Sequence, residues 1–244
     1  CPNSIKKKIT KKTKAIMLTH LFGYPADMRQ IMKIAKKHNL YVIEDCAQAP
    51  EATYKNRLVG TFGDIGIFSF NQNKTITTGE GGMIITKNKN LAKRSGFIRN
   101  HGEVVVDQYN EKNISGLIGY NYRMTEIEAA IGIEQHKKLK KLNDLRINNA
   151  KYLTNKLRKY EKLFFLPSSG CNLCNGICQS RHVYFVYPFR LKRKNILGIH
   201  RDLFVKAVQA EGLPLYGGYV RPIYYEPMYQ RKIAYGKKGF PFKS

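Results

Sequence analysis

Five polar features of the sequence occur in an order that could do chemistry. Asp45 closes a short apolar run, and Gln48 follows three residues later. Ser69 closes a second apolar run, Lys74 lies five residues beyond it, and a Gly-Glu-Gly-Gly turn occupies residues 79–82. Taken singly these residues say little, because an acid at a strand end is often a helix cap and a loop lysine is usually solvated. Their combination is what indicates a site.

Pyridoxal 5'-phosphate (PLP) chemistry needs this combination of groups. The cofactor forms a Schiff base with an amine, which Lys74 provides. A carboxylate, here Asp45, keeps the pyridine nitrogen protonated so that the ring can take up electrons. Hydroxyls and backbone N–H groups bind the phosphate, and Ser69 and the glycine-rich turn are suited to that. The residues therefore favour PLP as the cofactor.

Short strands and one helix must position these residues. Strands are predicted at Ala15–Leu18, Tyr41–Ile43, Ile65–Phe70 and Met83–Thr86 from their apolar runs. Asp27 can cap a helix between the first two strands, because the apolar residues after it fall at helical spacing. This strand–helix–strand order predicts an α/β domain with a parallel sheet.

The second half of the chain has a different pattern. Residues 125–160 have helical periodicity, and Thr125 with Glu128 fits a capping box. An aromatic strand is predicted at Val183–Phe189 and a helix at Arg201–Ala210. A long helix followed by this change in the sequence pattern suggests a boundary between two domains.

The sequence resembles the DegT/DnrJ/StrS family of PLP-dependent sugar aminotransferases over nearly its whole length, from about residue 9 to 242. The resemblance is strongest between residues 42 and 132. Its ordered blocks are Glu44-Asp45-Cys46-Ala47-Gln48-Ala49, Val59–Asp64, Phe68–Lys74, Thr78–Gly82, Arg99–Gly102 and Gly119–Met124.

The resemblance implies an α/β fold of the PLP-dependent transferase fold type I, like aspartate aminotransferase. Such a fold has a large domain with a mostly parallel sheet and a smaller α+β C-terminal domain. We expect residues 1–145 to form the large PLP-binding domain and residues 146–244 the small one. Both are expected to be incomplete, because the family's phosphate-binding Gly-Thr or Gly-Ser turn lies upstream of Cys1 and its C-terminal end lies beyond Phe242.

The resemblance also implies roles for individual residues. Lys74 would form the Schiff base and afterwards move a proton between substrate and cofactor. Asp45 would pair with the pyridinium nitrogen, and Gln48 would hydrogen-bond the ring oxygen of the cofactor. Ser69 would bind the phosphate. Asn121 would reach the phosphate held by a partner subunit, so that two active sites would be shared in a homodimer.

The implied reaction moves an amino group from glutamate or glutamine to a keto group on a nucleotide-linked sugar or a cyclitol. A minority of relatives are dehydratases with His at the lysine position, and Lys74 argues against that activity here. Because no secretion signal opens the chain, a cytoplasmic enzyme is expected. The resemblance implies no membrane partner.

The composition raises an alternative. The 244 residues include 43 Lys and Arg against 17 Asp and Glu, a formal net charge of +26. A truncated or degenerate relative that binds a polyanion such as nucleic acid is therefore the second hypothesis. Nucleic acid is the less favoured partner, because the lysines are not interleaved with aromatic residues.

One group of cysteines has the residue types of a metal site. Cys171, Cys174 and Cys178 crowd a short stretch, and His182 follows four residues later. The spacing is not that of a common zinc finger, and the family needs no metal, so we expect an exposed loop with free thiols and no metal. His20, directly after the first predicted strand, is a candidate for contact with substrate or cofactor, against a packing role.

Overall fold

The computed structural model describes residues 1–102, 116–167, 180–192, 198–234 and 239–242. In chain order the main elements are α1 (Pro2–Lys8), β1 (Ala15–Thr19), α2 (Met28–His38), β2 (Tyr41–Asp45), β3 (Thr53–Tyr54), β4 (Arg57–Leu58), β5 (Ile65–Ser69), β6 (Gly82–Ile85), α3 (Lys89–Arg99), α4 (Glu126–Leu157), β7 (Phe164–Phe165), β8 (Ser180–Arg181), β9 (Arg190–Leu191), α5 (Arg201–Ala210) and α6 (Pro227–Arg231).

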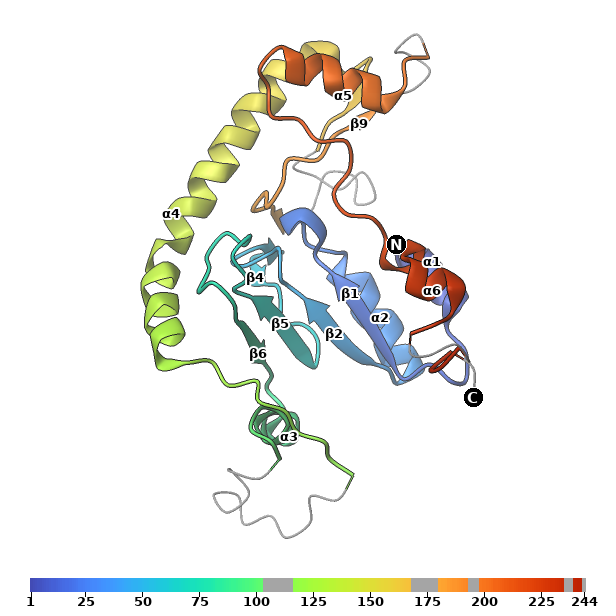
Figure 1. The fold of residues 1–244 in the computed structure, drawn as a ribbon, viewed down its shortest axis with the longest axis vertical. Coiled ribbons are helices and arrows are strands. Elements are labelled where there is room, and N and C mark those ends of the chain that lie inside the picture. Colours follow the sequence, from blue (N-terminus) through green and yellow to red (C-terminus); the bar gives the residue numbers. More distant parts are fainter. Residues whose placement is uncertain (103–115, 168–179, 193–197, 235–238, 243–244) are drawn as a thin grey trace. The chain divides into compact units, whose positions relative to one another are not determined.

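A four-stranded sheet with the order β1-β2-β5-β6 forms the centre of the first part of the chain (Figure 1). β1, β2 and β5 are parallel, and β6 is antiparallel to β5. The α/β class and the mostly parallel sheet predicted from the sequence are therefore confirmed.

Helix α2 follows β1 and covers one face of the sheet. Asp27 caps it as predicted, since its carboxylate accepts a hydrogen bond from the backbone N–H of Gln30 at 3.3 Å. The helix ends at Asn39, which is in the left-handed conformation. The apolar side chains of the helix and of the two strands form one buried cluster: Ile16, Leu18, Met28, Ile31, Ile34, Ala35 and Val42.

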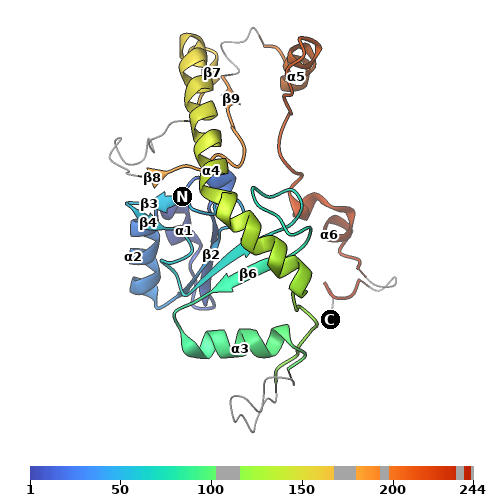
Figure 2. The same cartoon turned by 90° about the vertical axis from the view of Figure 1, so that its left-hand side faces the viewer.

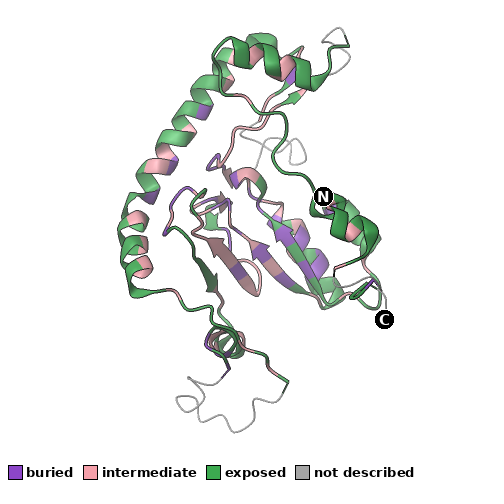
Figure 3. Cartoon of the chain, in the orientation of Figure 1, coloured by how far each residue is buried: buried purple, intermediate pink, exposed green. Residues whose placement is uncertain are grey.

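The other face of the sheet carries the complementary set of side chains, because residues alternate along a strand. Met17 and Tyr41 lie on this face and are 66% and 62% exposed. Asp45 is on the same face, since it is in register with Thr19 and Ile67. Figure 3 shows how buried and exposed residues alternate along β1 and β2. The predicted site therefore lies on the face that α2 does not cover.

Helix α4 is one continuous helix of 32 residues (Figure 2). It begins at a capping box in which Thr125 and Glu128 exchange side-chain and backbone hydrogen bonds, as the sequence predicts. Leu139, Asn143 and Ala150 are its buried residues. Most of the helix is therefore exposed among the residues that the structure describes (Figure 3).

The strand predicted at Val183–Phe189 is not formed, and this prediction was wrong. Tyr184 has a positive φ of 49°, which interrupts an extended strand. The backbone N–H groups of Val183 and Phe185 instead donate to the carbonyls of Gly23 and Phe22, at 3.1 and 3.0 Å. The segment thus pairs locally with the turn after β1, while the short strands β8 and β9 flank it.

The chain divides into two compact units by its internal contacts. The first comprises Cys1–Glu161 and Leu166–Arg190, and the second comprises Lys162–Phe165 and Leu191–Ser244. The second unit contains α5, α6 and most of the β7–β9 pair. The expected division between residues 145 and 146 falls inside α4 and stays a prediction.

Candidate cofactor site

The predicted site residues Asp45 and Ser69 end two neighbouring strands. Asp45 is the last residue of β2 and Ser69 is the last residue of β5. β2 and β5 are parallel, with Asp45 opposite Ile67, so both strands end at one edge of the sheet and both side chains belong to one face. Ligands of open α/β sheets bind outside this carboxyl edge. Figure 1 lets the reader follow the two strand ends.

The carboxylate of Asp45 is held in place from two sides. Its Oδ2 accepts a hydrogen bond from the hydroxyl of Thr19 at 3.3 Å, and its Oδ1 accepts one from the backbone N–H of Ala47 at 3.0 Å. The side chain is half-buried. Because an ionised carboxylate has about four acceptor positions, these two bonds leave room for a further donor such as a pyridinium N–H.

Gln48 and Ser69 have defined partners as well. The side-chain carbonyl of buried Gln48 accepts a 2.6 Å hydrogen bond from the backbone N–H of Phe22. This bond directs the amide oxygen to the turn after β1. The hydroxyl of Ser69 accepts from the backbone N–H of Asn71 at 3.3 Å, so it caps the start of the loop that carries Lys74.

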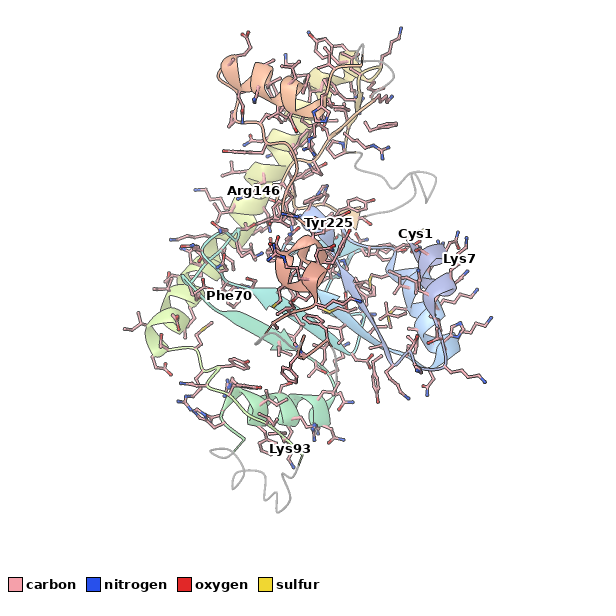
Figure 4. The ribbon with its side chains drawn as sticks, turned by 45° about the vertical axis from the view of Figure 1, so that its right-hand side comes forward. Cys1, Lys7, Phe70, Lys93, Arg146 and Tyr225 are labelled. Carbon is pink, nitrogen blue, oxygen red and sulfur yellow. The ribbon has the colours of Figure 1, made fainter. Side chains whose placement is uncertain are left out.

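The Lys74 loop runs from β5 to β6 and is closed by backbone bonds. Thr78 N–H donates to the carbonyl of Phe70 at 3.0 Å, and Phe70 N–H donates to the carbonyl of Gly81 at 2.9 Å. Gly81 needs to be glycine, because a Cβ there would lie 2.7 Å from the side chains of Met124 and Thr78. The base of this loop is marked by Phe70 in Figure 4. Lys74 is therefore presented by a constrained loop.

Two aromatic residues that sequence reasoning missed connect Lys74 to Gln48. The Nζ of Lys74 lies 5.2 Å from the ring centroid of Phe185. Phe185 N–H donates to the carbonyl of Phe22, whose own N–H donates to Gln48. A series of contacts thus joins Lys74 to the residue three positions after Asp45. Nothing in the sequence relates residues 22 and 185.

The turn at Phe22 is conformationally unusual. Phe22 has a φ of 59°, rare for a bulky residue, and Gly23 has a φ of 85°. A Cβ on Gly23 would lie 2.8 Å from a methyl group of Val183 and 3.0 Å from the carbonyl of Gln48. The close approach of these three segments therefore requires a glycine, and it brings the 183–185 segment to the site.

Asn121 lies in a different environment. It forms a β-bridge with Asn100 at the end of α3, and its side chain is exposed. Among the described residues, no recorded contact joins Asn121 to Asp45 or Lys74. The structure thus brings four of the five predicted residues to one region and leaves Asn121 on the surface.

Under the site, on the opposite face of β2, Glu44 is fully buried. Its Oε1 accepts from the backbone N–H groups of Phe62 at 2.7 Å and Gly63 at 2.6 Å. Its Oε2 accepts from Gly60 N–H at 2.8 Å and from His20 Nε2 at 3.0 Å. Burial alone would raise its pKa, but these donors together hold the pKa of Glu44 below its ordinary value. Glu44 therefore fixes the loop before β5.

His20 is a packing residue by its contacts. Its Nδ1 accepts from the backbone N–H of Ala26 at 3.1 Å, so its proton is on Nε2 and is donated to Glu44. His20, Glu44 and Cys46 lie close enough together for a metal, but the ring nitrogens and both carboxylate oxygens are occupied. Burial raises the pKa of the Cys46 thiol. We therefore assign this cluster no metal.

The second candidate metal site, predicted from three cysteines and His182, lies partly outside the residues that the structure describes. Cys171, Cys174 and Cys178 lie outside the described residues. His182 lies inside them, and its Nε2 donates to the carbonyl of Phe22 at 3.0 Å while its ring stacks on Tyr184 at 3.7 Å. Burial lowers the pKa of His182 to about 4.

The residues present fit PLP. The sheet edge offers a carboxylate with spare acceptor positions, a lysine amine, an amide and a hydroxyl, all within the first unit. Such a set at the carboxyl edge of a mostly parallel sheet is typical of PLP-binding proteins of the aminotransferase fold.

Comparison with known proteins gives the family. The DegT/DnrJ/EryC1/StrS aminotransferase family matches residues 1–243, and the chain belongs to it. It is 56% identical over 133 residues to the GDP-perosamine synthase of Escherichia coli O157:H7, covering 54% of this chain and 35% of that protein. It is 32% identical to an L-glutamine:2-deoxy-scyllo-inosose aminotransferase of Streptoalloteichus tenebrarius, covering 97% of this chain and 56% of that protein.

Solved structures of related proteins support the same family assignment. An aminotransferase from Psychrobacter cryohalolentis matches with a TM-score of 0.80 and 36% identity, over 89% of this chain and 57% of that one. An E. coli GDP-4-keto-6-deoxy-D-mannose-3-dehydratase with bound hydrated PLP matches with a TM-score of 0.73 and 28% identity, over 87% and 55% of the two chains. The family and fold predicted from the sequence are thus confirmed.

These matches cover most of this chain but only part of each relative. This chain spans little more than half the length of the relatives and solved structures that it matches over most of its own length. The described residues contain no helix long and apolar enough to cross a membrane.

Proposed function

We propose that this chain carries the PLP site of an aminotransferase and that Lys74 and Asp45 are its principal groups. The observation that supports this most is the convergence of Lys74, Gln48 and Asp45 at one sheet edge, joined through Phe22 and Phe185. When bound, PLP supplies an aldehyde that bonds covalently to an amine and a protonated ring that withdraws electrons from the substrate carbon.

Each residue at this site would have a separate function. Asp45, whose carboxylate is held by Thr19 and Ala47, would accept the hydrogen bond of the ring N–H. The Lys74 amine would hold the cofactor and would then carry a proton to and from the substrate carbon. The ring of Phe185 covers the Lys74 amine on one side, which limits the directions from which water reaches it. The Ser69 hydroxyl, which accepts from the backbone N–H of Asn71, would bind the phosphate.

We infer the substrate class of this chain from the activities of similar proteins. Similar proteins are a GDP-perosamine synthase and a glutamine:scyllo-inosose aminotransferase, which act on a nucleotide-linked sugar and a cyclitol. We therefore assign the acceptor as a keto-sugar or keto-cyclitol and the donor as glutamate or glutamine. A dehydratase also matches in structure, so the fold does not decide the reaction; Lys74 favours amino transfer.

A homodimer in the cytoplasm belongs to this proposal. Exposed apolar residues lie close to Asn121 in the sequence: Ile118 is 74% exposed, Tyr120 50%, Tyr122 64% and Ile127 75%. A patch of this kind favours a protein partner. A second copy against this patch would place Asn121 where it reaches the partner's phosphate.

The test is cofactor binding followed by amino transfer. The purified protein is titrated with PLP, visible absorbance is recorded, and glutamate-dependent formation of 2-oxoglutarate is then measured. Lys74→Ala is expected to lose the visible band, and Asp45→Asn to weaken PLP binding roughly 10- to 100-fold, as expected for losing a hydrogen bond to a charged group. Lys87→Ala, which changes an exposed lysine after β6, is the control. A visible band that persists unchanged in Lys74→Ala would overturn the proposal.

A further inference from the structure

The first two helices carry a cationic surface that the aminotransferase proposal does not use. Between residues 2 and 40 the chain has nine lysines and one arginine against a single acid, Asp27. All ten cationic side chains are exposed. We name as the α1–α2 cationic surface the residues Lys6, Lys7, Lys8, Lys11, Lys12, Lys14, Arg29, Lys33, Lys36 and Lys37.

The surface is part of the folded protein. Ile5 and Ile9 pack against the cluster that contains Ile31 and Ile34 of α2, so α1 and α2 lie side by side. Figure 4 shows Lys7 on the outer side of α1, away from the sheet. The cations are therefore held on two anchored helices.

No acidic side chain of the described residues neutralises the charge on this surface. Asp27 is engaged by Gln30 and by the hydroxyl of Tyr54, at 2.7 and 2.8 Å. No recorded ion pair among the described residues involves any of the ten cations. A dense field of one sign is therefore directed to solvent.

Helix α4 provides an internal comparison. It too has a run of lysines, but Lys137 pairs with Glu134 at 2.5 Å and Lys140 pairs with Asp144 at 2.6 Å. Lysine content alone thus does not produce an unpaired cationic face. Among the described residues, two of the four lysines in this α4 run have a recorded acidic partner, whereas none of the ten cations of the α1–α2 cationic surface has one.

Helix-end electrostatics explain only part of this surface. Lys6, Lys7 and Lys8 lie in the last turn of α1, and Lys36 and Lys37 lie in the last turn of α2, where cations are stabilised by the helix dipole. The other five cations have no such position. They are Lys11, Lys12, Lys14, Arg29 and Lys33.

We propose that the α1–α2 cationic surface binds the anionic headgroups of a phospholipid bilayer. Nine of its ten cations are lysines, point charges that suit a diffuse layer of phosphates, whereas nucleic-acid recognition favours arginine and stacked aromatic residues. The apolar residues of the two helices are used in the core, so the contact is electrostatic and needs no inserted segment. The protein would thereby be held at a membrane surface without crossing it.

Vesicle sedimentation tests this inference with the full chain. The four-site variant Lys7→Gln, Lys11→Gln, Lys33→Gln, Lys37→Gln removes charge from the surface. The control variant Lys137→Gln, Lys138→Gln, Lys140→Gln, Lys141→Gln removes the same formal charge from α4. Mixed phosphatidylcholine–phosphatidylglycerol vesicles are the probe, and phosphatidylcholine vesicles and a DNA duplex are the comparisons.

The expected result is binding to the mixed vesicles that falls with added salt and is absent with phosphatidylcholine alone. The α1–α2 variant should bind at least about 100-fold more weakly, and the α4 variant less than about 10-fold more weakly. Equal losses in the two variants, binding to neutral vesicles, or tighter binding to the duplex at equal phosphate concentration would each overturn the inference. PLP binding, which uses none of these residues, reports separately that both variants are folded.

Discussion

The buried carboxylate of Glu44 should be a principal determinant of stability, and Glu44→Gln tests this with almost no change of shape. Glu44 accepts four hydrogen bonds, from three backbone N–H groups and from His20. A glutamine can accept through its amide oxygen only, so two of the four donors lose their acceptor. His20 cannot adapt by moving its proton, because its other nitrogen accepts from Ala26.

The magnitude follows from the count of lost acceptors. Each buried donor left unsatisfied costs about 1–3 kcal/mol, so Glu44→Gln should lower the free energy of unfolding by about 2–6 kcal/mol. This is a large share of the roughly 5–15 kcal/mol that stabilises an ordinary domain.

The effect should depend on pH in a stated direction. The folded-state pKa of Glu44 lies below its ordinary value of 4.5, so its contribution is fully present above about pH 4.5. It is lost as the pH falls through the lower folded-state value. The difference between the wild type and Glu44→Gln should therefore be largest near neutral pH and should shrink in acid.

Urea unfolding followed by circular dichroism at neutral and at acidic pH is the assay. The midpoint should fall for Glu44→Gln with little change in slope. Glu134→Gln, which changes an exposed acid on α4, is the matched control and should not move the midpoint measurably. Equal midpoints for the wild type and Glu44→Gln at neutral pH would refute this reasoning.

Three further outcomes are expected. Gly23→Ala should destabilise the fold by about 2 kcal/mol or more in thermal melts, because φ is +85° and the new Cβ would lie 2.8 Å from Val183; an unchanged melting temperature would contradict this. Thr125→Ala should cost about 1 kcal/mol in urea unfolding, since it removes the capping box with Glu128, while Thr125→Ser should retain most of it. The pKa of His182 is lowered to about 4 from 6.5, so stability should fall as the pH drops from about 6.5 to about 4; His182→Phe should flatten that part of the pH profile, and an unaltered slope would exclude His182 as its cause.

Much of the sheet could be predicted from sequence because its signals are local. The apolar runs of β1, β2, β5 and β6 match the observed strands to within a residue or two, and Asp27 and Thr125 are the caps that their positions suggest. Each signal depends on neighbouring residues, which a linear pattern retains.

The predictions that were wrong or missing concern segments whose structure depends on contacts with residues far away in the sequence. The aromatic run at 183–189 favours a strand by composition, but its backbone pairs with the turn at Phe22 and Gly23, about 160 residues away. For the same reason a linear pattern does not place Phe185 beside Lys74 or Phe22 beside Gln48. No role was predicted for Glu44, although its buried carboxylate accepts four hydrogen bonds under the site.

The predicted roles of Asp45, Gln48, Ser69 and Lys74 come from their order along the chain and from the family resemblance. The structure explains why residues far apart in the sequence could share one site. The parallel strands β2 and β5 end at the same edge of the sheet, so the residues that follow each strand lie at that edge. The role of Asn121 depends on a second subunit, which one chain cannot provide.

The most direct test of the central claim is to locate where PLP attaches. The protein is incubated with PLP and reduced with borohydride, and the phosphopyridoxyl group is then mapped by peptide mass spectrometry. The account predicts one dominant modified peptide, the one that contains Lys74, with much less modification in Asp45→Asn. Modification spread over the many surface lysines, or concentrated on a lysine far from Asp45, would contradict it.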